Sequence, residues 1–576
     1  MQDQPHVVSS NLSLQLASER VEAQTPNIRL SLMLSVTGRV LVSQTEVTAP
    51  GMNLQGVIAW CRGRMRNSTS SLQTRHLIVT RLGASWCVSQ PRGRALRLTE
   101  TLLGLLLLAI FLSVRDLPLV DLPQHALQLA SWLRLDAHAA GVSQFELNFR
   151  TPYLLGYPLA RALAVFLPIL TALKLTFWAS ITLQAVALRK LCAGLGHDAW
   201  LGLLGFPLGL GYSFCFGFVA FCSALPLVYL VFLQAFRHRA APSFKGGLGF
   251  AATLALLLVA HGVALGFLLV VLGPLLLWGG GKLWQRVLPL LAPPLLGALW
   301  LLPGGRSTRL GGDYWAFEPE RLLEIPGQLV GIGSADRVAT VLGACLLLAV
   351  ALSLGARRSW LLLFPLVAAF LGYALFPSMF RGAGPLGPRF SSYFVPAALV
   401  AFAPRSRETP ARQLARRALI FVVSATVVLV FAWRLPAFNR ETADFHALAA
   451  RLPTGLELRP LVFERGGRAF PGTPAHLHMP AYYSLEKGGS AGYSFAMYSI
   501  SVVRFRKGVR IKMAGGAEWA PERFDAAQEA ADYDYFIVKS SFDRTASLFP
   551  GPAPAAVLDQ HIGDWWGYRR VAPATL

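Results

Sequence analysis

Charged residues are scarce in this chain. Asp, Glu, Lys and Arg make up 14% of its 576 residues, whereas soluble proteins contain about 25%. Hydrophobic residues make up 54%, and they are gathered into blocks that approach or exceed the roughly 18 apolar residues needed to cross a bilayer. Soluble core helices rarely repeat that pattern, so the composition predicts a polytopic membrane protein and excludes a soluble globular one.

Cysteine is also sparse. The chain has six cysteines, none of them after Cys345, and it contains no CxxC pair and no Cys/His cluster. The C-terminal part therefore has no disulfide framework, and no zinc site is predicted.

Acidic residues are few relative to basic ones, which gives a formal net charge of +23. Such a charge is typical of nucleic-acid binding, but here the arginines and lysines lie in short loops between apolar runs, and no basic stripe alternates with aromatic residues. This placement is the pattern of cytoplasmic loops in membrane proteins. We therefore expect membrane lipid as a partner, and no nucleic acid.

The first 95 residues differ from the rest. Residues 1–95 are rich in Ser, Thr and Gln, contain no lysine and show no sustained helical or strand period. They also lack the short apolar core of a signal peptide. Two interpretations remain open, a disordered cytoplasmic tail or translation that begins near the first apolar run. Both predict a dispensable segment.

The basic loops predict about eleven transmembrane helices within 96–434. Their predicted bounds are 96–114, 172–190, 199–213, 217–236, 247–260, 262–278, 285–303, 339–355, 359–376, 391–403 and 416–433. The apolar segment 153–169 carries Arg161 in its middle, which suits a re-entrant or interfacial helix better than a span. Treating it as non-spanning places every later basic loop inside, and the first loop, 115–171, outside.

Composition changes again after the last span. Asp, Glu, Arg and aromatic residues return in 435–576, where short strand-like runs alternate with helical patches. A segment of this length is within the usual domain range. The expected architecture is thus an all-α polytopic membrane protein with a small exoplasmic α/β domain at its C-terminus.

The segment directly after the first span is rich in residues that can carry chemistry. Asp121 stands where a helix N-cap belongs, Pro123 lies in the first turn, and Gln124 completes a capping-box-like pattern. His125 follows Asp121 at helical spacing, and the apolar face of 122–133 would lie on the membrane. Asp121 would either cap an interfacial helix or accept a proton at the water–lipid boundary.

Two sequence stretches resemble a known superfamily. The order of a short span, Asp121-Leu-Pro-Gln-His125, an interfacial helix and many later spans is similar to the GT-C integral membrane glycosyltransferases, whose corresponding loop often has Asp-Tyr-Pro-Asn-His. The bacterial relatives of protein mannosyltransferases and lipid-A glycosyltransferases resemble the chain most. Tyr212-Ser-Phe-Cys-Phe-Gly-Phe218 resembles their Tyr-Asn-x-x-Phe-x-x-Gly-Phe stretch. The resemblance covers about 96–440.

The resemblance implies a catalytic role for Asp121, with Asp116 as the runner-up, and substrate-binding roles for Gln124, His125 and Tyr212. It implies a polyprenyl-phosphate-linked sugar donor, and an envelope glycan, lipid or protein as acceptor. It also implies a place in the bacterial inner membrane, with the C-terminal domain periplasmic or extracellular. The second acidic residue of many members would here be Asp116 or Glu146. No metal ligand is assigned, and dependence on a divalent metal stays open.

Three further residues are candidates for substrate binding. Arg381 and Arg389 lie on the predicted exoplasmic side, against the trend for basic residues. Because guanidinium groups form bidentate hydrogen bonds with phosphate, they are candidates for holding the donor phosphate, or else a phospholipid headgroup. His261 interrupts a long apolar stretch and is either a hinge residue bonded to a backbone carbonyl or a site residue.

These residues predict a glycosyltransferase that works by inverting single displacement, with a base on one side of the sugar and a leaving phosphate on the other. One alternative is a lipid or polysaccharide transporter or flippase, and another is a non-catalytic GT-C-like membrane protein. A transporter predicts inverted repeats with broken helices in both halves. The sequence has one broken segment, at His261, and its polar residues gather at one face, which favours an enzyme.

Overall fold

The computed structural model describes residues 20–25, 28–34, 40–47, 92–139, 141–278, 282–301, 319–377, 384–405, 408–513 and 515–571. It divides into two compact units, 1–89 and 90–576. The described part of the first unit is a three-stranded antiparallel sheet, consisting of β1 (Arg20–Thr25), β2 (Ile28–Leu34) and β3 (Val40–Val47). Residues 1–95, in which the sequence shows no sustained strand period, thus include three short strands among their described residues.

Removal of the first unit tests whether it is dispensable. We expect a chain that begins at Gln90 to enter the membrane and to keep the activity of the full chain, because the second unit contains the apolar helices and the whole cavity described below. The measurements are the amount of protein in the membrane fraction and its specific activity. A truncated chain that fails to insert, or inserts without activity, contradicts this prediction.

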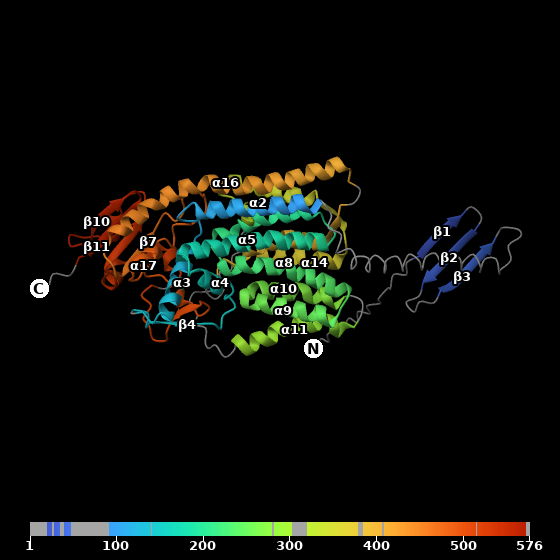
Figure 1. Ribbon diagram of the computed structural model, residues 1–576, viewed down its shortest axis with the longest axis horizontal. Helices are drawn as coiled ribbons and strands as arrows, with labels where there is room; N and C mark the ends of the chain where they lie inside the picture. Colours follow the sequence, from blue (N-terminus) through green and yellow to red (C-terminus); the bar gives the residue numbers. More distant parts are fainter. Residues whose placement is uncertain are drawn as a thin grey trace, which may run out of the picture. The chain divides into compact units, whose positions relative to one another are not determined.

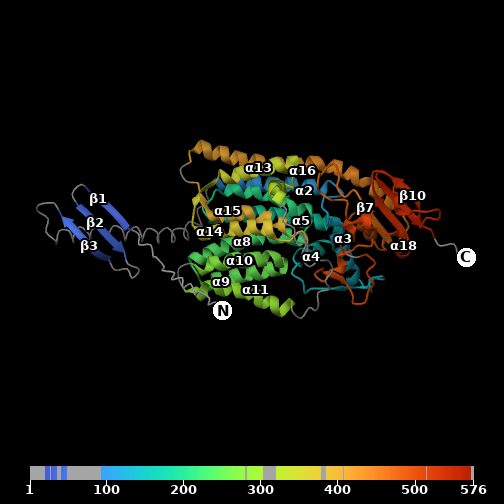
Figure 2. The same ribbon diagram turned by 180° about the vertical axis from the view of Figure 1, so that it is seen from behind.

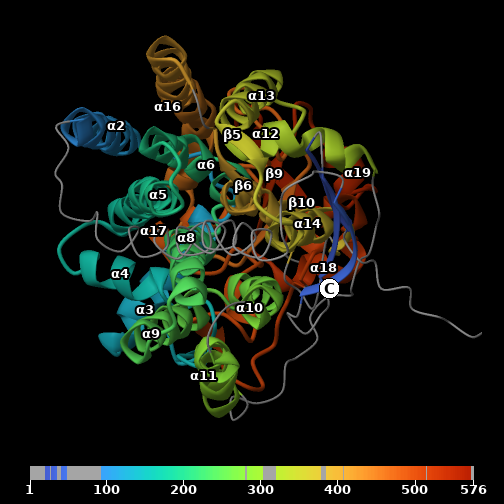
Figure 3. The same ribbon diagram turned by 90° about the vertical axis from the view of Figure 1, so that its right-hand side faces the viewer.

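A bundle of apolar helices forms most of the second unit (Figures 1 and 2). Its longer helices are α2 (Arg92–Leu112), α5 (Ile169–Gly194), α8 (Val219–Ala240), α9 (Phe244–Ala260), α10 (Gly262–Leu277), α11 (Leu283–Leu301), α13 (Arg337–Ala351), α14 (Trp360–Leu375) and α16 (Pro410–Arg451). Shorter pieces between them are η2 (Ala199–Leu204), α6 (Gly205–Gly209), α7 (Tyr212–Cys215), α12 (Ile325–Val330), η5 (Gly387–Tyr393) and α15 (Phe394–Ala401). The end-on view in Figure 3 shows α8, α9, α10 and α11 as neighbours, in agreement with their contacts.

Four of the described helices are long and apolar enough to cross a membrane, judged by length and composition. They are Gly93–Leu112, Ile169–Leu195, Val219–Ala240 and Pro410–Arg451. Shorter apolar helical segments are Ala199–Cys215, Phe244–Ala260, Gly262–Leu277, Arg337–Ala351 and Trp360–Leu375. These helices indicate an integral membrane protein. Every predicted span overlaps helical residues, but the number of eleven crossings stays a prediction.

The apolar segment 153–169 contains only a short helix, α4 (Gly156–Leu163). Eight residues of α-helix rise about 12 Å, far less than the roughly 30 Å of hydrocarbon in a bilayer. Arg161 in this helix forms an ion pair with Asp136, with 2.7 Å between Nη2 and Oδ2. The short helix agrees with the expectation that this segment does not span.

The helix after the first span, α3 (Leu122–Asp136), buries inside the protein the apolar face that was expected to lie on the membrane. Leu122, Ala126 and Leu129 are fully buried inside the protein. The helix packs against α5 on the bundle side and against α17 (Ala481–Lys487) of the C-terminal domain. Protein therefore covers the apolar stripe of α3. An amphipathic sequence pattern alone cannot tell whether protein or lipid covers such a stripe.

The C-terminal domain is built on a four-stranded sheet in the order β10-β11-β9-β7. Its strands are β7 (Leu458–Val462), β9 (Tyr535–Lys539), β10 (Ala556–Ile562) and β11 (Trp565–Arg570). β7 and β9 are parallel, and the other neighbours are antiparallel. A separate pair, β4 (Phe145–Leu147) with β8 (Val503–Phe505), joins the first loop to this domain.

Helix α16 connects the bundle to the sheet without a break. Its 42 residues give a length of about 63 Å. The last predicted span ends at 433, but the helix continues to Arg451, and Phe445 near its end packs against Trp565 of β11, with ring centroids 4.9 Å apart. The same helix therefore serves as a candidate membrane span and as part of the domain core.

Candidate active site

A cavity of about 350 Å³ lies where the first loop, the bundle and the C-terminal domain meet. This volume is within the range of small-molecule sites, about 300–1,000 Å³. Polar and aromatic side chains on its wall include Asp121, His125, Tyr153, Tyr157, Phe218, His261, Arg389, His478, Tyr493, Glu518 and Trp519. Residues from distant parts of the sequence thus form one site.

The two sequence motifs lie directly against each other. The backbone N–H groups of Val120 and Asp121 donate to the carbonyl oxygens of Cys215 and Phe216, at 3.1 and 3.0 Å. Gly217 has a φ of +81°, and a Cβ there would lie 3.1 Å from the backbone nitrogen of Asp121. A glycine is therefore needed at this close approach.

Asp121 occupies the N-cap position of α3, but its side chain makes no capping hydrogen bond. Its backbone is helical, with φ −92° and ψ −3°, rather than extended as in a usual cap. The carboxylate instead lines the cavity, and its Oδ1 lies 3.1 Å from Nδ1 of His478 without the alignment of a hydrogen bond. The capping interpretation is wrong, and the carboxylate is free to meet a ligand.

His478 and Glu518 are cavity residues that the sequence analysis missed. His478 is buried and stacks on Tyr493, with centroids 5.0 Å apart, and neither of its ring nitrogens has a hydrogen-bond partner in the described part of the chain. Glu518 accepts the N–H of Gly516 at 2.9 Å, and burial raises the pKa of its carboxyl. The sequence signals were weak, a His-x-His pair and an acid after two glycines, and neither points to Asp121.

Asp116, the runner-up for the base, does not line the cavity. Its Oδ2 accepts hydrogen bonds from Oγ1 of Thr442 and Nε2 of His446, both at 2.8 Å. Burial by itself would raise the pKa of this carboxyl, but the hydrogen bonds and nearby positive charge outweigh burial, and the pKa is lowered. Asp116 therefore holds the first loop against α16, in a structural contact.

Arg389 is a buried cation at the cavity wall. Its guanidinium lies over the ring of Phe218, 3.7 Å from the centroid. Nε donates to the carbonyl oxygen of Pro385 at 2.9 Å, and Nη2 donates to that of Gly384 at 2.6 Å. Among the described residues, no carboxylate forms an ion pair with it. These contacts fix the guanidinium group without a directly paired carboxylate in the described part of the chain.

His261 lies beside Arg389 at the break between α9 and α10. Its Nδ1 accepts the N–H of Ala264 at 3.2 Å, so the proton of the neutral ring is on Nε2. Nε2 is 3.5 Å from Nη1 of Arg389, and these two donors suit a shared anion rather than each other. Among the described residues, the ring of His261 is bonded to a backbone N–H and not to a carbonyl, and it caps α10 while lining the cavity.

The neighbours of Asp121 on α3 have different positions. His125 lines the cavity, and its Nδ1 is 2.5 Å from the hydroxyl of Tyr157. Burial lowers the pKa of His125 to about 4, so its ring is neutral at pH 7. Gln124 lies outside the cavity wall, where it donates to the carbonyl of Tyr493 and accepts the N–H of Phe495, each at 3.2 Å. It fixes the wall contributed by the C-terminal domain.

The remaining candidates are not brought to the cavity. Glu146 forms an ion pair with Arg504 across β4 and β8, at 2.7 Å. Tyr212 packs in a small apolar cluster with Val120 and does not line the cavity. Arg381 lies outside the described residues. Within the described ranges no group of three or more His, Cys, Asp or Glu is arranged to hold a metal ion.

No protein-family model and no curated protein matches the chain. Among solved structures, it is similar to the arabinofuranosyltransferase AftD from Mycobacteria, with a TM-score of 0.43 and 15% sequence identity. The match covers 83% of this chain, which spans 40% of that chain. A similarity of this size does not by itself assign a fold or an activity.

Proposed function

We propose that the chain is a membrane glycosyltransferase that moves a sugar from a polyprenyl-phosphate donor to a glycan, lipid or protein acceptor of the cell envelope. The observation that supports it is a single cavity. The carboxylate of Asp121, which makes no helix-capping hydrogen bond, lines this cavity together with the N–H donors of Arg389 and His261. A carboxylate accepts a proton from an acceptor hydroxyl, and clustered donors bind a phosphate.

The reaction is a single displacement. The acceptor oxygen attacks the anomeric carbon while Asp121 takes the hydroxyl proton. The bond from the anomeric carbon to the phosphate oxygen breaks, and its electron pair leaves with the lipid phosphate. Arg389 and the Nε2–H of His261 stabilise that charge. Attack and departure on opposite faces of the sugar invert the anomeric centre.

Reconstituted vesicles test the proposal. The full chain is inserted into vesicles with a polyprenyl-phosphate-linked sugar and an envelope extract, and labelled product is measured for the unchanged protein and for Asp121→Asn. Transfer that depends on the protein and is lost in the variant supports the enzyme. Movement of the lipid-linked sugar across the bilayer without transfer would instead support a transporter.

The proposed topology places the N-terminus inside, and the first loop and the residues after 434 outside, in the periplasm of a bacterial inner-membrane protein. In a background without native cysteines, single cysteines at Ser143 and Ser547, both exposed, should react with impermeant thiol reagents in intact cells. A cysteine at exposed Ala241 should react only after permeabilisation. The opposite labelling pattern would rule out this topology.

A further inference from the structure

Arg286 is a buried arginine in the first turn of α11, and only 4% of it is exposed. Its Nε and Nη1 are buried without a hydrogen-bond partner in the described part of the chain. The ion pairs of the described residues do not include it. A buried charge with neither a counter-ion nor satisfied donors strongly disfavours the folded state, so this position requires an anion.

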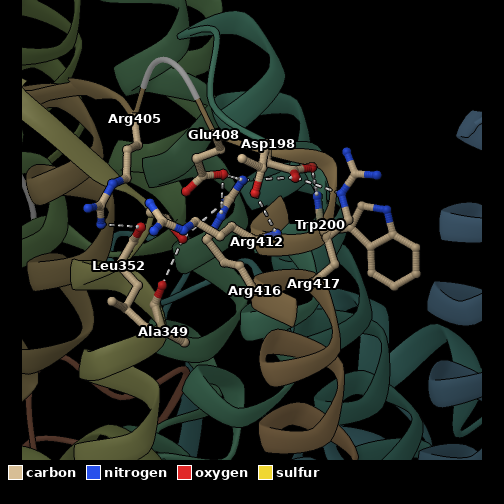
Figure 4. Close-up of polar contacts among 11 residues, drawn as sticks. Asp198, Trp200, Ala349, Leu352, Arg405, Glu408, Arg412, Arg416 and Arg417 are labelled. Atoms are coloured by element: carbon tan, nitrogen blue, oxygen red, sulfur yellow. Dashed lines mark hydrogen bonds and ion pairs between the residues drawn. The ribbon is translucent and has the colours of Figure 1, made fainter. Parts of the chain in front are cut away.

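Two arginines at the start of α16, at this end of the bundle, have acidic partners. Nη2 of Arg416 lies 2.9 Å from Oε2 of Glu408 and 3.4 Å from Oδ2 of Asp198. Nε of Arg417 lies 2.7 Å from the same Asp198 oxygen. Figure 4 shows these carboxylates between the guanidinium groups at the start of α16. Carboxylates therefore neutralise the guanidinium groups of Arg416 and Arg417, whereas Arg286 has no carboxylate partner among the described residues.

The sequence explains the departure. No Asp or Glu occurs between Asp198 and Asp313, so α8, α9, α10 and α11 contain no acidic residue. Their ends and the turns between them contribute Arg237, His238, Arg239, Lys245, Lys282 and Arg286. These helices pack on one another, and none of them supplies a counter-ion for Arg286.

The immediate neighbours of Arg286 add to the positive charge. Arg239 is close enough for the charge of Arg286 to act on it, and its Nε donates to the carbonyl of Trp278 at 2.6 Å. Nε2 of buried His238 is 2.8 Å from the carbonyl oxygen of Gln285, so Nε2 carries the proton, and Nδ1 has no partner in the described chain. Two cations and unsatisfied polar atoms meet at one place.

This cluster lies far from the cavity. Val219 lines the cavity at the start of α8, and Arg239 lies near the other end of that 22-residue helix, about 30 Å away along its axis. Large exposed apolar side chains are close to the cluster in sequence: Trp278, Trp284 and Phe244 are 64%, 58% and 86% exposed. Exposed tryptophans of this kind mark the membrane–water interface, at the depth of lipid phosphates.

We infer that Arg286 and Arg239 bind a phosphate group at the end of the bundle opposite the cavity, and that the phosphate belongs to the headgroup of an anionic phospholipid. Basic pockets between helices are suited to such headgroups, and the guanidinium fork of Arg286 matches phosphate oxygens. The site neutralises the buried charge and fixes the ends of α8 and α11. It does not depend on the proposed glycosyltransferase activity.

The test measures the thermal stability of the purified full chain in detergent, with phosphatidylglycerol, phosphatidylcholine or inorganic phosphate added in separate series. The variants are Arg286→Met and, as a matched control, Lys245→Gln, which removes one charge from an exposed position at the same end. Methionine fills the arginine volume with apolar atoms, and such replacements of buried ions usually leave a protein folded. Without lipid, Arg286→Met should be at least as stable as the unchanged protein.

Phosphatidylglycerol should raise the melting temperature of the unchanged protein and of Lys245→Gln at similar concentrations, and phosphatidylcholine should do so much less. For Arg286→Met, the half-saturating concentration should rise about 10- to 100-fold, the loss expected for one charge-assisted hydrogen bond. An equal response of Arg286→Met and Lys245→Gln overturns the site, as does an unchanged protein that responds to neither phosphatidylglycerol nor phosphate. Stabilisation by inorganic phosphate alone, lost in Arg286→Met, supports the phosphate site and overturns its assignment to lipid.

Discussion

Sugar transfer by an Asp121→Asn variant is expected to fall by about 10²- to 10⁴-fold, the usual contribution of a general base. Asn nearly matches the size and shape of Asp but cannot accept the proton of the acceptor hydroxyl. The measurement is the initial rate of transfer in vesicles, normalised to the amount of folded protein.

Expression and melting temperature of this variant should stay unchanged. The loss of a helix cap typically costs about 0.5–2 kcal/mol, but the side chain of Asp121 makes no capping bond that could be lost. Its contact with His478 lacks hydrogen-bond alignment, so little stability depends on it. A large activity loss in a stable protein therefore separates a chemical role from a structural one.

Two matched controls make the same carboxylate-to-amide change elsewhere. Glu146→Gln, in a partly exposed ion pair outside the cavity, should alter neither rate nor stability appreciably. Asp116→Asn should lower stability, because the neutral amide lacks the charge that strengthens the bonds from Thr442 and His446 to Oδ2. It also buries an NH2 group where Oδ1 has no partner in the described part of the chain. If Asp121→Asn turns over normally, Asp121 is not the base, and Glu518 becomes the carboxylate to examine.

Activity should be highest with Arg at position 389, lower with Lys and lowest with Ala. Alanine removes the fork that would bind the donor phosphate, and the expected loss is about 10²-fold or more, because each charge-assisted hydrogen bond contributes about 1.5–3 kcal/mol. Lysine keeps the charge but loses the planar group that stacks on Phe218 and reaches the carbonyls of Gly384 and Pro385.

Because the phosphate gains charge as it leaves, the Arg389 substitutions should lower kcat together with kcat/KM. A change in KM alone is not expected. Arg115→Ala is the control, since Arg115 lies on the same side in a half-exposed ion pair with Glu486 and should have little effect. Equal activity of the Arg, Lys and Ala forms at position 389 would reduce this residue to a lipid headgroup anchor.

The local features of the fold could be predicted from the sequence. Apolar runs located most of the longer helices within a few residues, because a continuous apolar run is visible in the sequence itself. They missed the C-terminal extension of α16 and the breaks within 199–213 and 391–403. Asp121 was singled out by its capping-box-like motif and the resemblance that this motif carries. His261 and Arg389 were singled out because their residue types conflict with an apolar or positive-inside pattern. All three line one cavity.

Features that depend on long-range contacts could not be predicted. Whether protein or lipid covers α3 is decided by the C-terminal domain, and whether Asp121 caps α3 is decided by its backbone angles. His478 and Glu518 meet Asp121 only through tertiary packing across most of the chain. Asp116, Gln124 and Glu146 were assigned to the site but do not line the cavity, because nearness in sequence does not fix the direction of a side chain.

The unbroken helix α16 sets the rotational phase between the bundle and the C-terminal domain. Each residue of an α-helix turns the chain by about 100° and advances it by about 1.5 Å. One residue inserted between Arg434 and Phe445 would therefore rotate the sheet, and the cavity wall that contains His478 and Glu518, by more than a quarter turn relative to Arg389. Insertions and deletions in this part of the helix are thus incompatible with an intact cavity, whereas the composition of its outward-facing residues is free to vary.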